Sequence, residues 1–206
     1  MTPGRRAHLA ILAGLAIASL SGPSAIPGVA LEPPHTATAE GVADPAADPH
    51  VRWALDYLER RRTGLTDSER DRVAHAIVRE ARRWELEPEL VLAVIHVESR
   101  GNTFALSPVG AMGLMQILPS TGTELAQKHD VHWRGDQTLF DPVVNVRLGV
   151  AYLHWLAERY DNLPTALAAY NWGPGRIDRR LRRGSPLPVE YPKLVFDALE
   201  ERNSLL

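Results

Sequence analysis

The sequence from residue 66 onward is divided into segments by helix-start signals, and these limit its folds more than any other feature. Thr66 opens a capping box with Glu69, and apolar residues then follow at helical spacing. Prolines at first-turn positions start later segments at Pro88, Pro119 and Pro142. No stretch shows the strict alternation of a half-buried strand. The pattern therefore predicts helices packed on helices around one core.

The other expected helices are shorter. An amphipathic helix is predicted at 51–62, another lies in LPTALAAYNWGPG and ends at Gly173–Pro174, and a last one runs from about 190 to 200. We expect an all-α domain over 66–206, preceded by a short helix and connection over 51–65.

The N-terminal region has the composition of an export signal followed by a linker. MTPGRR supplies a positive start, LAILAGLAIASL an apolar run, and SGPSAIPGVALE the small residues that a signal peptidase cuts beside. We predict a signal peptide over 1–30; an uncleaved anchor is the open alternative. Residues 31–50 are rich in Pro and Ala and poor in large apolar side chains, which predicts a disordered linker.

Composition excludes several classes of function. The formal net charge of −2 argues against a nucleic-acid partner. The chain has no cysteine, so disulfides, thiolate nucleophiles and Cys-based metal sites are ruled out. His129 and His132 lack a metal-ligand pattern, and no calcium-loop motif is present. We expect no metal and no cofactor.

One expected helix carries a carboxylate on its apolar stripe. In LVLAVIHVESRGN, residues Val91, Val94, Ile95 and Glu98 share one face at 3.6-residue spacing. Glu98 also stands in the last turn before Gly101. Desolvation and the negative end of the helix dipole both favour its protonated form. A carboxylic acid kept neutral near pH 6 can serve as the general acid of glycosidic bond cleavage.

Four ordered segments give this carboxylate a context. ES at 98–99 is followed by SPVGAMGLMQILPST at 107–121, LFDPVVNVRLGVAYL at 139–153 and AAYNWGPGRI at 168–177. In this order and spacing, the E-S, G-L-M-Q and A-Y-N segments resemble those of the soluble lytic transglycosylase family. The resemblance implies a goose-type lysozyme-like fold that cleaves peptidoglycan glycan strands.

The resemblance also assigns roles by position. It makes Glu98 the catalytic acid and base. The residues it places along the sugar-binding groove are Ser99, Gly113, Leu114, Met115, Gln116, Tyr170 and Asn171. Core packing is the alternative for Leu114 and Met115. Tyr170 is expected to bond the sugar or Glu98, Ser99 to orient Glu98, and Gly113 to let the backbone approach the glycan.

The chain departs from the family near its C-terminus. Many members carry a tyrosine in a P-x-E-T-x-x-Y-V stretch, whereas LPVEYPKLV places Leu194 there without a gap. Tyr191 lies one helical turn earlier and is our candidate replacement; packing of the last helix is an equally good reading. The basic run at 176–184 is expected to be a solvated face, with contact to muramic-acid or peptide carboxylates near the groove as the alternative, and Trp155 is expected in the core.

The resemblance implies a reaction with one carboxylate, because no second acid falls in the E-S, G-L-M-Q or A-Y-N segments that it places at the site. Peptidoglycan strands are then the partner, the chain acts as a monomer in the periplasm or cell envelope, and service to envelope or secretion machinery stays open. A hydrolytic muramidase on the same fold and a non-catalytic glycan-binding component are the alternatives.

Overall fold

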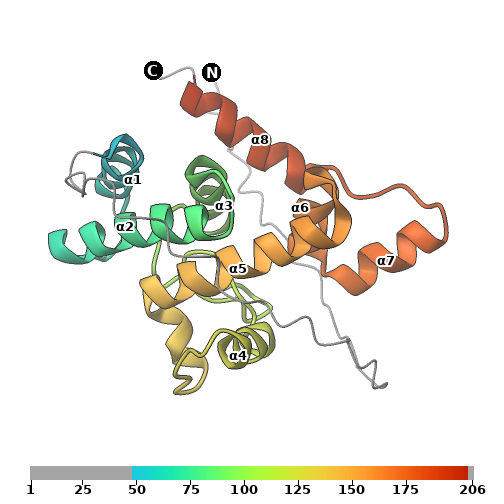
Figure 1. Ribbon diagram of the computed structural model, residues 1–206, viewed down its shortest axis with the longest axis horizontal. Helices are drawn as coiled ribbons and strands as arrows, with labels where there is room; N and C mark the ends of the chain where they lie inside the picture. The colour runs from blue at the N-terminus through green and yellow to red at the C-terminus, as the bar shows by residue number, and fades with distance from the viewer. Residues whose placement is uncertain (1–47, 204–206) are drawn as a thin grey trace, which may run out of the picture.

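The computed structural model describes residues 48–203 as helices joined by short connections (Figure 1). The predicted signal peptide and most of the predicted linker lie outside these residues. The helices are α1 (Pro49–Glu59), α2 (Asp67–Arg83), α3 (Pro88–Ser99), α4 (Pro119–Lys128), the 3₁₀ helix η2 (Asp136–Phe140), α5 (Pro142–Tyr160), α6 (Leu163–Trp172), α7 (Pro174–Arg182) and α8 (Glu190–Asn203). Within the described part, extended pairing is confined to isolated bridges in the loop after α3.

The helix starts agree with the capping residues. Thr66 accepts a hydrogen bond from the backbone of Glu69, while the Glu69 side chain accepts from the backbone of Thr66 at 2.8 Å. Asp141 accepts from two backbone amides at the start of α5, where Pro142 occupies the first turn. Local sequence therefore sets where α2 and α5 begin, as predicted.

Two helix predictions need correction. The first helix begins at Pro49 and ends at Glu59, so it starts inside the predicted linker, with Asp48 as its N-cap. The pair Gly173–Pro174 ends α6 and also starts α7, because Pro174 occupies the first turn of the next helix. The basic run after it is thus largely helical, which the sequence analysis did not predict.

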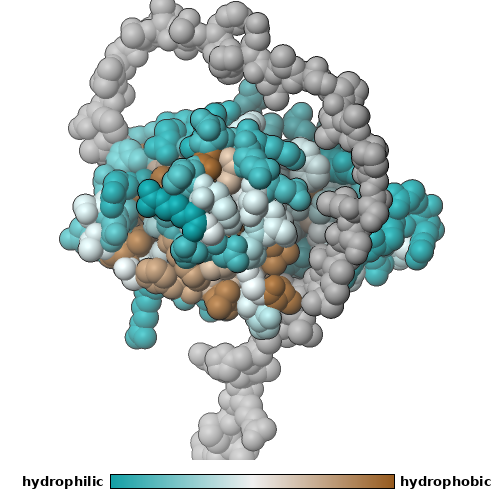
Figure 2. Space-filling model, turned by 90° about the horizontal axis from the view of Figure 1, so that it is seen from below, coloured by the Kyte–Doolittle hydropathy of each residue, from teal (hydrophilic) through white to brown (hydrophobic). Residues whose placement is uncertain are grey.

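The core lies where α2, α3, α5 and α6 meet. In Figure 1, α5 crosses the centre of the molecule, with α2 and α3 above it and α4 below it. α5 packs on both α2 and α6, while α1 packs on α2 and α8 on α3. Val91, Val94 and Ile95 of α3 are completely buried, as their shared stripe predicted. The space-filling view shows apolar side chains in patches among hydrophilic ones on the lower face (Figure 2).

This packing sets the place of the candidate site. Because α8 lies against α3, the start of α8 is brought to the C-terminal end of α3. α6 in turn packs on α8, and the loop between α3 and α4 closes beneath α6. Segments from four distant parts of the chain therefore meet around the end of α3.

Candidate active site

Glu98 lies in the last turn of α3, next to a left-handed helix end. Arg100 has φ 55° and Gly101 has φ 81°, and together they turn the chain away from the helix. The Glu98 side chain keeps partial contact with solvent, although protein surrounds most of it. Burial raises the pKa of Glu98 to about 7, and a hydrogen bond from Tyr191 acts in the opposite direction. Near neutral pH the carboxyl therefore exists in both protonation states.

Tyr191 is the partner of this carboxyl. Its hydroxyl donates to Glu98 Oε1 at 2.6 Å, and its side chain is buried, with 4% exposed. Leu194, which stands at the ungapped family position, is 37% exposed and so does not occupy that place in the core. Tyr191 thus packs α8 against the core and also contacts Glu98, while its replacement of the family's C-terminal tyrosine stays a prediction.

Tyr170 does not bond Glu98, contrary to one of its two expected roles. Its hydroxyl donates to the backbone oxygen of Met115 at 2.8 Å. Its ring stacks on Tyr191 with centroids 6.5 Å apart and planes 11° apart. Burial raises the pKa of Tyr170 far above its usual value, and the charge of Glu98 adds to this. Tyr170 therefore holds Tyr191 from behind and stays a neutral donor.

Asn145 anchors the loop that carries the G-L-M-Q segment, and the sequence analysis missed it. Its buried Oδ1 accepts from Met115 N at 2.7 Å, and its Nδ2 donates to the backbone oxygens of Met112 (2.9 Å) and Leu139 (2.8 Å). The available signal was a polar amide inside the apolar helix segment VVNVRLGV.

Gly113 is required by the close packing of the protein interior, while its expected role toward the glycan stays a prediction. It has φ 79°, and a Cβ there would lie 2.3 Å from Asn145 Nδ2 and 2.4 Å from the Leu139 backbone oxygen. A glycine is therefore needed so that the loop can close on α5.

The side chains of Leu114 and Met115 lie in the core, so the expectation that they line the groove is wrong for these side chains. Both are completely buried. At Gly149 of α5 a Cβ would lie 2.4 Å from Met115 Sδ, so that glycine makes room for the methionine. Any contact of this segment with a ligand must use the backbone or Gln116.

The other predicted groove residues take different positions. Gln116, at φ 49°, donates through Nε2 to the backbone oxygens of Ala105 (3.1 Å) and Gly113 (2.9 Å). Ser99 donates to Ile95 O and accepts from Gly101 N, both at 3.1 Å, so it closes the helix end and does not bond Glu98. Asn171 is partly exposed near the end of α6.

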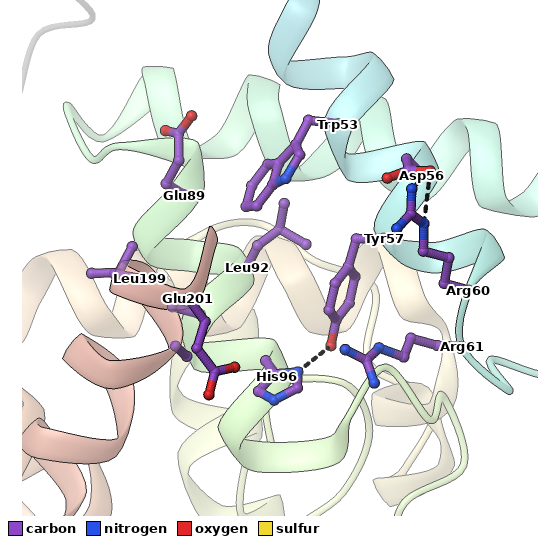
Figure 3. Close-up of a pocket in the computed structure, with 12 residues that line it drawn as sticks. Trp53, Asp56, Tyr57, Arg60, Arg61, Glu89, Leu92, His96, Leu199 and Glu201 are labelled. Atoms are coloured by element: carbon purple, nitrogen blue, oxygen red, sulfur yellow. Dashed lines mark hydrogen bonds and ion pairs between the residues drawn. The ribbon is translucent and has the colours of Figure 1, made fainter. Parts of the chain in front are cut away.

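A separate pocket lies on the other side of α3 (Figure 3). Its volume is about 160 Å³, and Trp53, Tyr57, Leu92 and His96 are among its lining residues. Tyr57 and His96 share a hydrogen bond of 3.3 Å. His96 therefore faces α1 and not Glu98, because residues two positions apart on a helix point to different faces.

Trp155 corrects another expectation, since it is 41% exposed and not part of the core. Its ring stacks on Tyr152 at a centroid distance of 5.9 Å, and Arg159 lies over it.

Comparison with known proteins decides the family. Residues 75–187, which contain Glu98, the loop at 113–116 and Tyr170, match the family described as Transglycosylase SLT domain. The chain belongs to this family. The match ends before Tyr191, so the contact at Glu98 includes a residue from beyond the matched region.

Similar proteins are named as lytic transglycosylases. The soluble lytic murein transglycosylase of Salmonella typhimurium is 37% identical over 48% of this chain and 16% of its own length. The membrane-bound lytic murein transglycosylase C of Actinobacillus pleuropneumoniae is 35% identical over 61% of this chain and 34% of its own length. The chain thus spans only a fraction of these curated relatives. The solved structure of an inactive mutant of the lytic transglycosylase Slt from Pseudomonas aeruginosa aligns with a TM-score of 0.51 and 28% identity, covering 73% of this chain and 26% of that one.

Residues 48–203 show neither a membrane-spanning helix nor a cluster of metal ligands. None of these helices is long and apolar enough to cross a membrane. No group of three or more His, Asp or Glu side chains in this part of the chain is arranged to hold a metal ion.

Proposed function

We propose that this protein is a peptidoglycan lytic transglycosylase in which Glu98 acts first as acid and then as base. The observation that carries the proposal is the state of Glu98: a partly exposed carboxyl with a pKa of about 7, hydrogen-bonded by Tyr191 at 2.6 Å. A group with this pKa is protonated often enough to donate and ionised often enough to accept near neutral pH. Membership of the family and the names of the relatives support the same activity.

The electrostatics of Glu98 favour a mechanism with one carboxylate. Among residues 48–203, the pKa of Glu98 is shifted by burial and by Tyr191, and no other carboxylate contributes to the shift. A two-carboxylate glycosidase needs a second acid across the scissile bond, and no such acid falls in the E-S, G-L-M-Q or A-Y-N segments.

The reaction then consists of two proton transfers, both at the Glu98 carboxyl. Protonated Glu98 donates to the oxygen between N-acetylmuramic acid and N-acetylglucosamine, and the C1–O bond of the muramoyl sugar breaks. The N-acetyl group of that sugar stabilises the positive charge at C1. Ionised Glu98 removes the proton from the C6 hydroxyl, whose oxygen bonds to C1. The products are a 1,6-anhydromuramoyl end and a free N-acetylglucosamine end, and no water is consumed.

Three residues hold the geometry of the site for these steps. Tyr191 fixes one carboxyl oxygen, and Tyr170 supports the Tyr191 ring from α6. Gln116 braces the loop through two backbone oxygens, so that the loop presents its backbone in one conformation. Such rigid positioning contributes to catalysis because it removes the entropy of alignment from the barrier.

We further propose that the protein is exported and acts in the cell envelope as a monomer. The substrate is found only there, and the N-terminal sequence has the composition of a signal peptide. Similar proteins include one named membrane-bound. The predicted signal peptide at 1–30 lies outside the described residues.

The deciding experiment is digestion of purified sacculi followed by mass spectrometry of the products. We expect anhydromuramoyl ends; ordinary reducing ends would identify a hydrolytic muramidase instead. Glu98→Gln should abolish cleavage while sacculus binding persists, and Glu158→Gln, an exposed glutamate of α5, is the matched control that should cleave normally. Undiminished cleavage by Glu98→Gln would refute the mechanism, and cleavage by neither protein would favour a binding component.

A further inference from the structure

The end of α7 carries a dense group of arginines on a projecting part of the molecule. Residues 176–183 read RIDRRLRR, although the whole chain has a formal net charge of −2. In Figure 1, α7 and the connection to α8 form one end of the molecule, away from α1 and α2. Figure 2 shows this end mainly in hydrophilic colours. Positive charge is therefore concentrated at one end of a chain that is slightly acidic as a whole.

Three of these arginines have no acidic partner in the described part of the chain. Arg179, Arg182 and Arg183 are exposed, and no carboxylate among residues 48–203 forms an ion pair with them. The acid of this helix, Asp178, accepts instead from Arg159 of α5 at 2.8 Å. The outer surface of α7 thus keeps positive charge that the nearby acid does not offset.

Apolar side chains are exposed at the same end. Ile177 of α7 is completely buried, whereas Leu181, one turn later on the same side of the helix, is 48% exposed. The apolar stripe of α7 therefore continues past the core and ends in solvent between arginines. Val189, in the connection that leads to α8, is 66% exposed. This end of the molecule offers apolar side chains together with positive charge.

The connection is fixed to α7, so the surface is formed in advance. Arg180 Nη1 donates to the backbone oxygen of Pro186 at 2.6 Å, and the same guanidinium lies 5.2 Å from the centroid of the Trp172 ring. Ser185 N also donates to the backbone oxygen of Arg180 at 2.9 Å. A surface that is already ordered loses less entropy when a partner binds.

Neither helix stability nor simple solvation explains the combination of features. Arginines in the last turn of α7 complement the helix dipole, but the dipole does not require an exposed leucine beside them. A solvated face likewise accounts for the arginines and gains nothing from Leu181 or Val189. A basic helix with apolar side chains beside its charges is typical of a segment that lies on a membrane surface.

We propose that the end of α7 and the connection after it bind the surface of a bilayer that contains anionic phospholipids. Groups of about four to eight basic residues on an amphipathic helix recognise such lipids, and residues 176–183 fall in this range. The arginines contact lipid phosphates, and Leu181 enters the interface at headgroup level. Because α6 and α8 adjoin this end, the candidate active site is held beside the membrane. The contact does not depend on the reaction assigned to Glu98.

The test places a reporter directly on this surface. The chain has no cysteine, so one introduced cysteine can carry a fluorophore whose emission shifts to shorter wavelength in lipid. The full chain is labelled in Leu181→Cys and, as the control, in Arg72→Cys, an exposed position on α2. Each protein is mixed with vesicles of phosphatidylcholine, with or without phosphatidylglycerol. We expect the label at 181 to shift only with the anionic vesicles and the label at 72 to shift with neither.

Charge is tested in the Leu181→Cys background. Arg179→Gln, Arg182→Gln and Arg183→Gln together should weaken binding to the anionic vesicles about a hundredfold, because each arginine near such a surface contributes about fivefold. The matched triple variant removes the same charge from exposed positions elsewhere and should keep the parent affinity; it carries Arg52→Gln, Arg62→Gln and Arg72→Gln. Residues 1–47 are the same in all these proteins, so binding through them cannot produce the difference.

Several results would overturn the proposal. One is an equal shift of the label at 181 with neutral and anionic vesicles, and another is an equal loss of affinity in the two triple variants. A response at 72 as large as that at 181 would show that another surface binds the vesicles. If the α7 triple variant loses binding to purified sacculi but not to anionic vesicles, the arginines serve the wall polymer and the proposal is wrong. No cleavage is measured, so these results are separate from the test of the proposed reaction.

Discussion

The hydroxyl of Tyr191 donates a 2.6 Å hydrogen bond to Glu98 Oε1, joining two residues that are 93 positions apart. The bond favours the ionised carboxyl, whereas burial favours the protonated one and is the larger effect. The charge of Glu98 also raises the pKa of Tyr191, after burial itself, so the hydroxyl keeps its proton. Tyr191 is therefore a donor to Glu98 in the ionised state that follows the first proton transfer.

Replacement of Tyr191 by phenylalanine should change the pH dependence of cleavage. The substitution removes a bond that stabilises the ionised carboxyl, so the pKa of Glu98 rises from about 7. The alkaline limb of kcat/KM, which follows loss of the Glu98 proton, then moves to higher pH. At pH 6 we expect kcat to fall about tenfold, because the carboxyl is no longer held in one orientation.

The matched control for this substitution is Tyr57→Phe, which removes a hydroxyl that bonds His96 in the pocket of Figure 3. Its pH profile should coincide with that of the unmodified protein. If Tyr191→Phe lowers activity equally at every pH, Tyr191 acts only by packing α8 against the core.

The raised pKa of Glu98 also has a cost in stability. When the pKa of a carboxyl is higher in the folded than in the unfolded state, its contribution to stability is fully present below the unfolded pKa of 4.5. That contribution is lost as the pH rises through the folded pKa of about 7. Glu98→Gln cannot ionise, so it avoids the loss. We therefore expect its free energy of unfolding at pH 8 to exceed that of the unmodified protein by about 1–3 kcal/mol.

Urea denaturation at pH 4.5 and pH 8 measures this difference. The advantage of Glu98→Gln should be small at the lower pH and larger at the higher one. An advantage that is the same at both values would mean that ionisation of Glu98 in the folded protein is not unfavourable, which would remove the basis for its role as an acid.

The sequence was sufficient for most helices because their start signals are local. Thr66 with Glu69, and Asp141 with Pro142, satisfy backbone groups only a few residues away, so the pattern contains the whole interaction. α7 was not predicted, because Gly173–Pro174 is typical of a helix end, although proline is also favoured in the first turn of a following helix. The start of α1 at Pro49 was missed for a related reason: Asp48 lies in a stretch whose composition resembles a linker.

The contacts of the candidate site could not be predicted from sequence patterns, because they join residues far apart in the chain. The stripe on α3 predicted a carboxyl with a raised pKa, but nothing near Glu98 in sequence points to Tyr191. Only the family resemblance suggested a C-terminal tyrosine, and it placed that residue at Leu194 without a gap. Likewise, no sequence spacing shows that Asn145 bonds Met115, which lies 30 residues earlier.

Asn145→Ala should destabilise the protein and loosen the G-L-M-Q loop together. The substitution leaves the Met115 amide and the Leu139 carbonyl without this buried partner, at about 1–3 kcal/mol each. We expect a total loss of about 3–5 kcal/mol in urea denaturation. Asn162→Ala removes an exposed N-cap of α6 instead and should cost only about 1 kcal/mol. Equal effects of the two substitutions would show that Asn145 does not anchor the loop.

Gly113→Ala tests whether close packing, and not backbone angle alone, fixes this loop. Gly113 (φ 79°) and Gly110 (φ 84°) both have left-handed backbones, but a Cβ at Gly113 would meet Asn145 at 2.3 Å, whereas one at Gly110 meets nothing within 4 Å. Gly110→Ala should therefore cost only backbone strain, about 1 kcal/mol, and Gly113→Ala at least about 3 kcal/mol. Because Tyr170 bonds the Met115 carbonyl of this loop and stacks on Tyr191, displacement of the loop also disturbs the support of Tyr191, and cleavage should fall more for Gly113→Ala. Equal losses of stability and activity in the two variants would mean that the loop can shift away from Asn145 without consequence for the site.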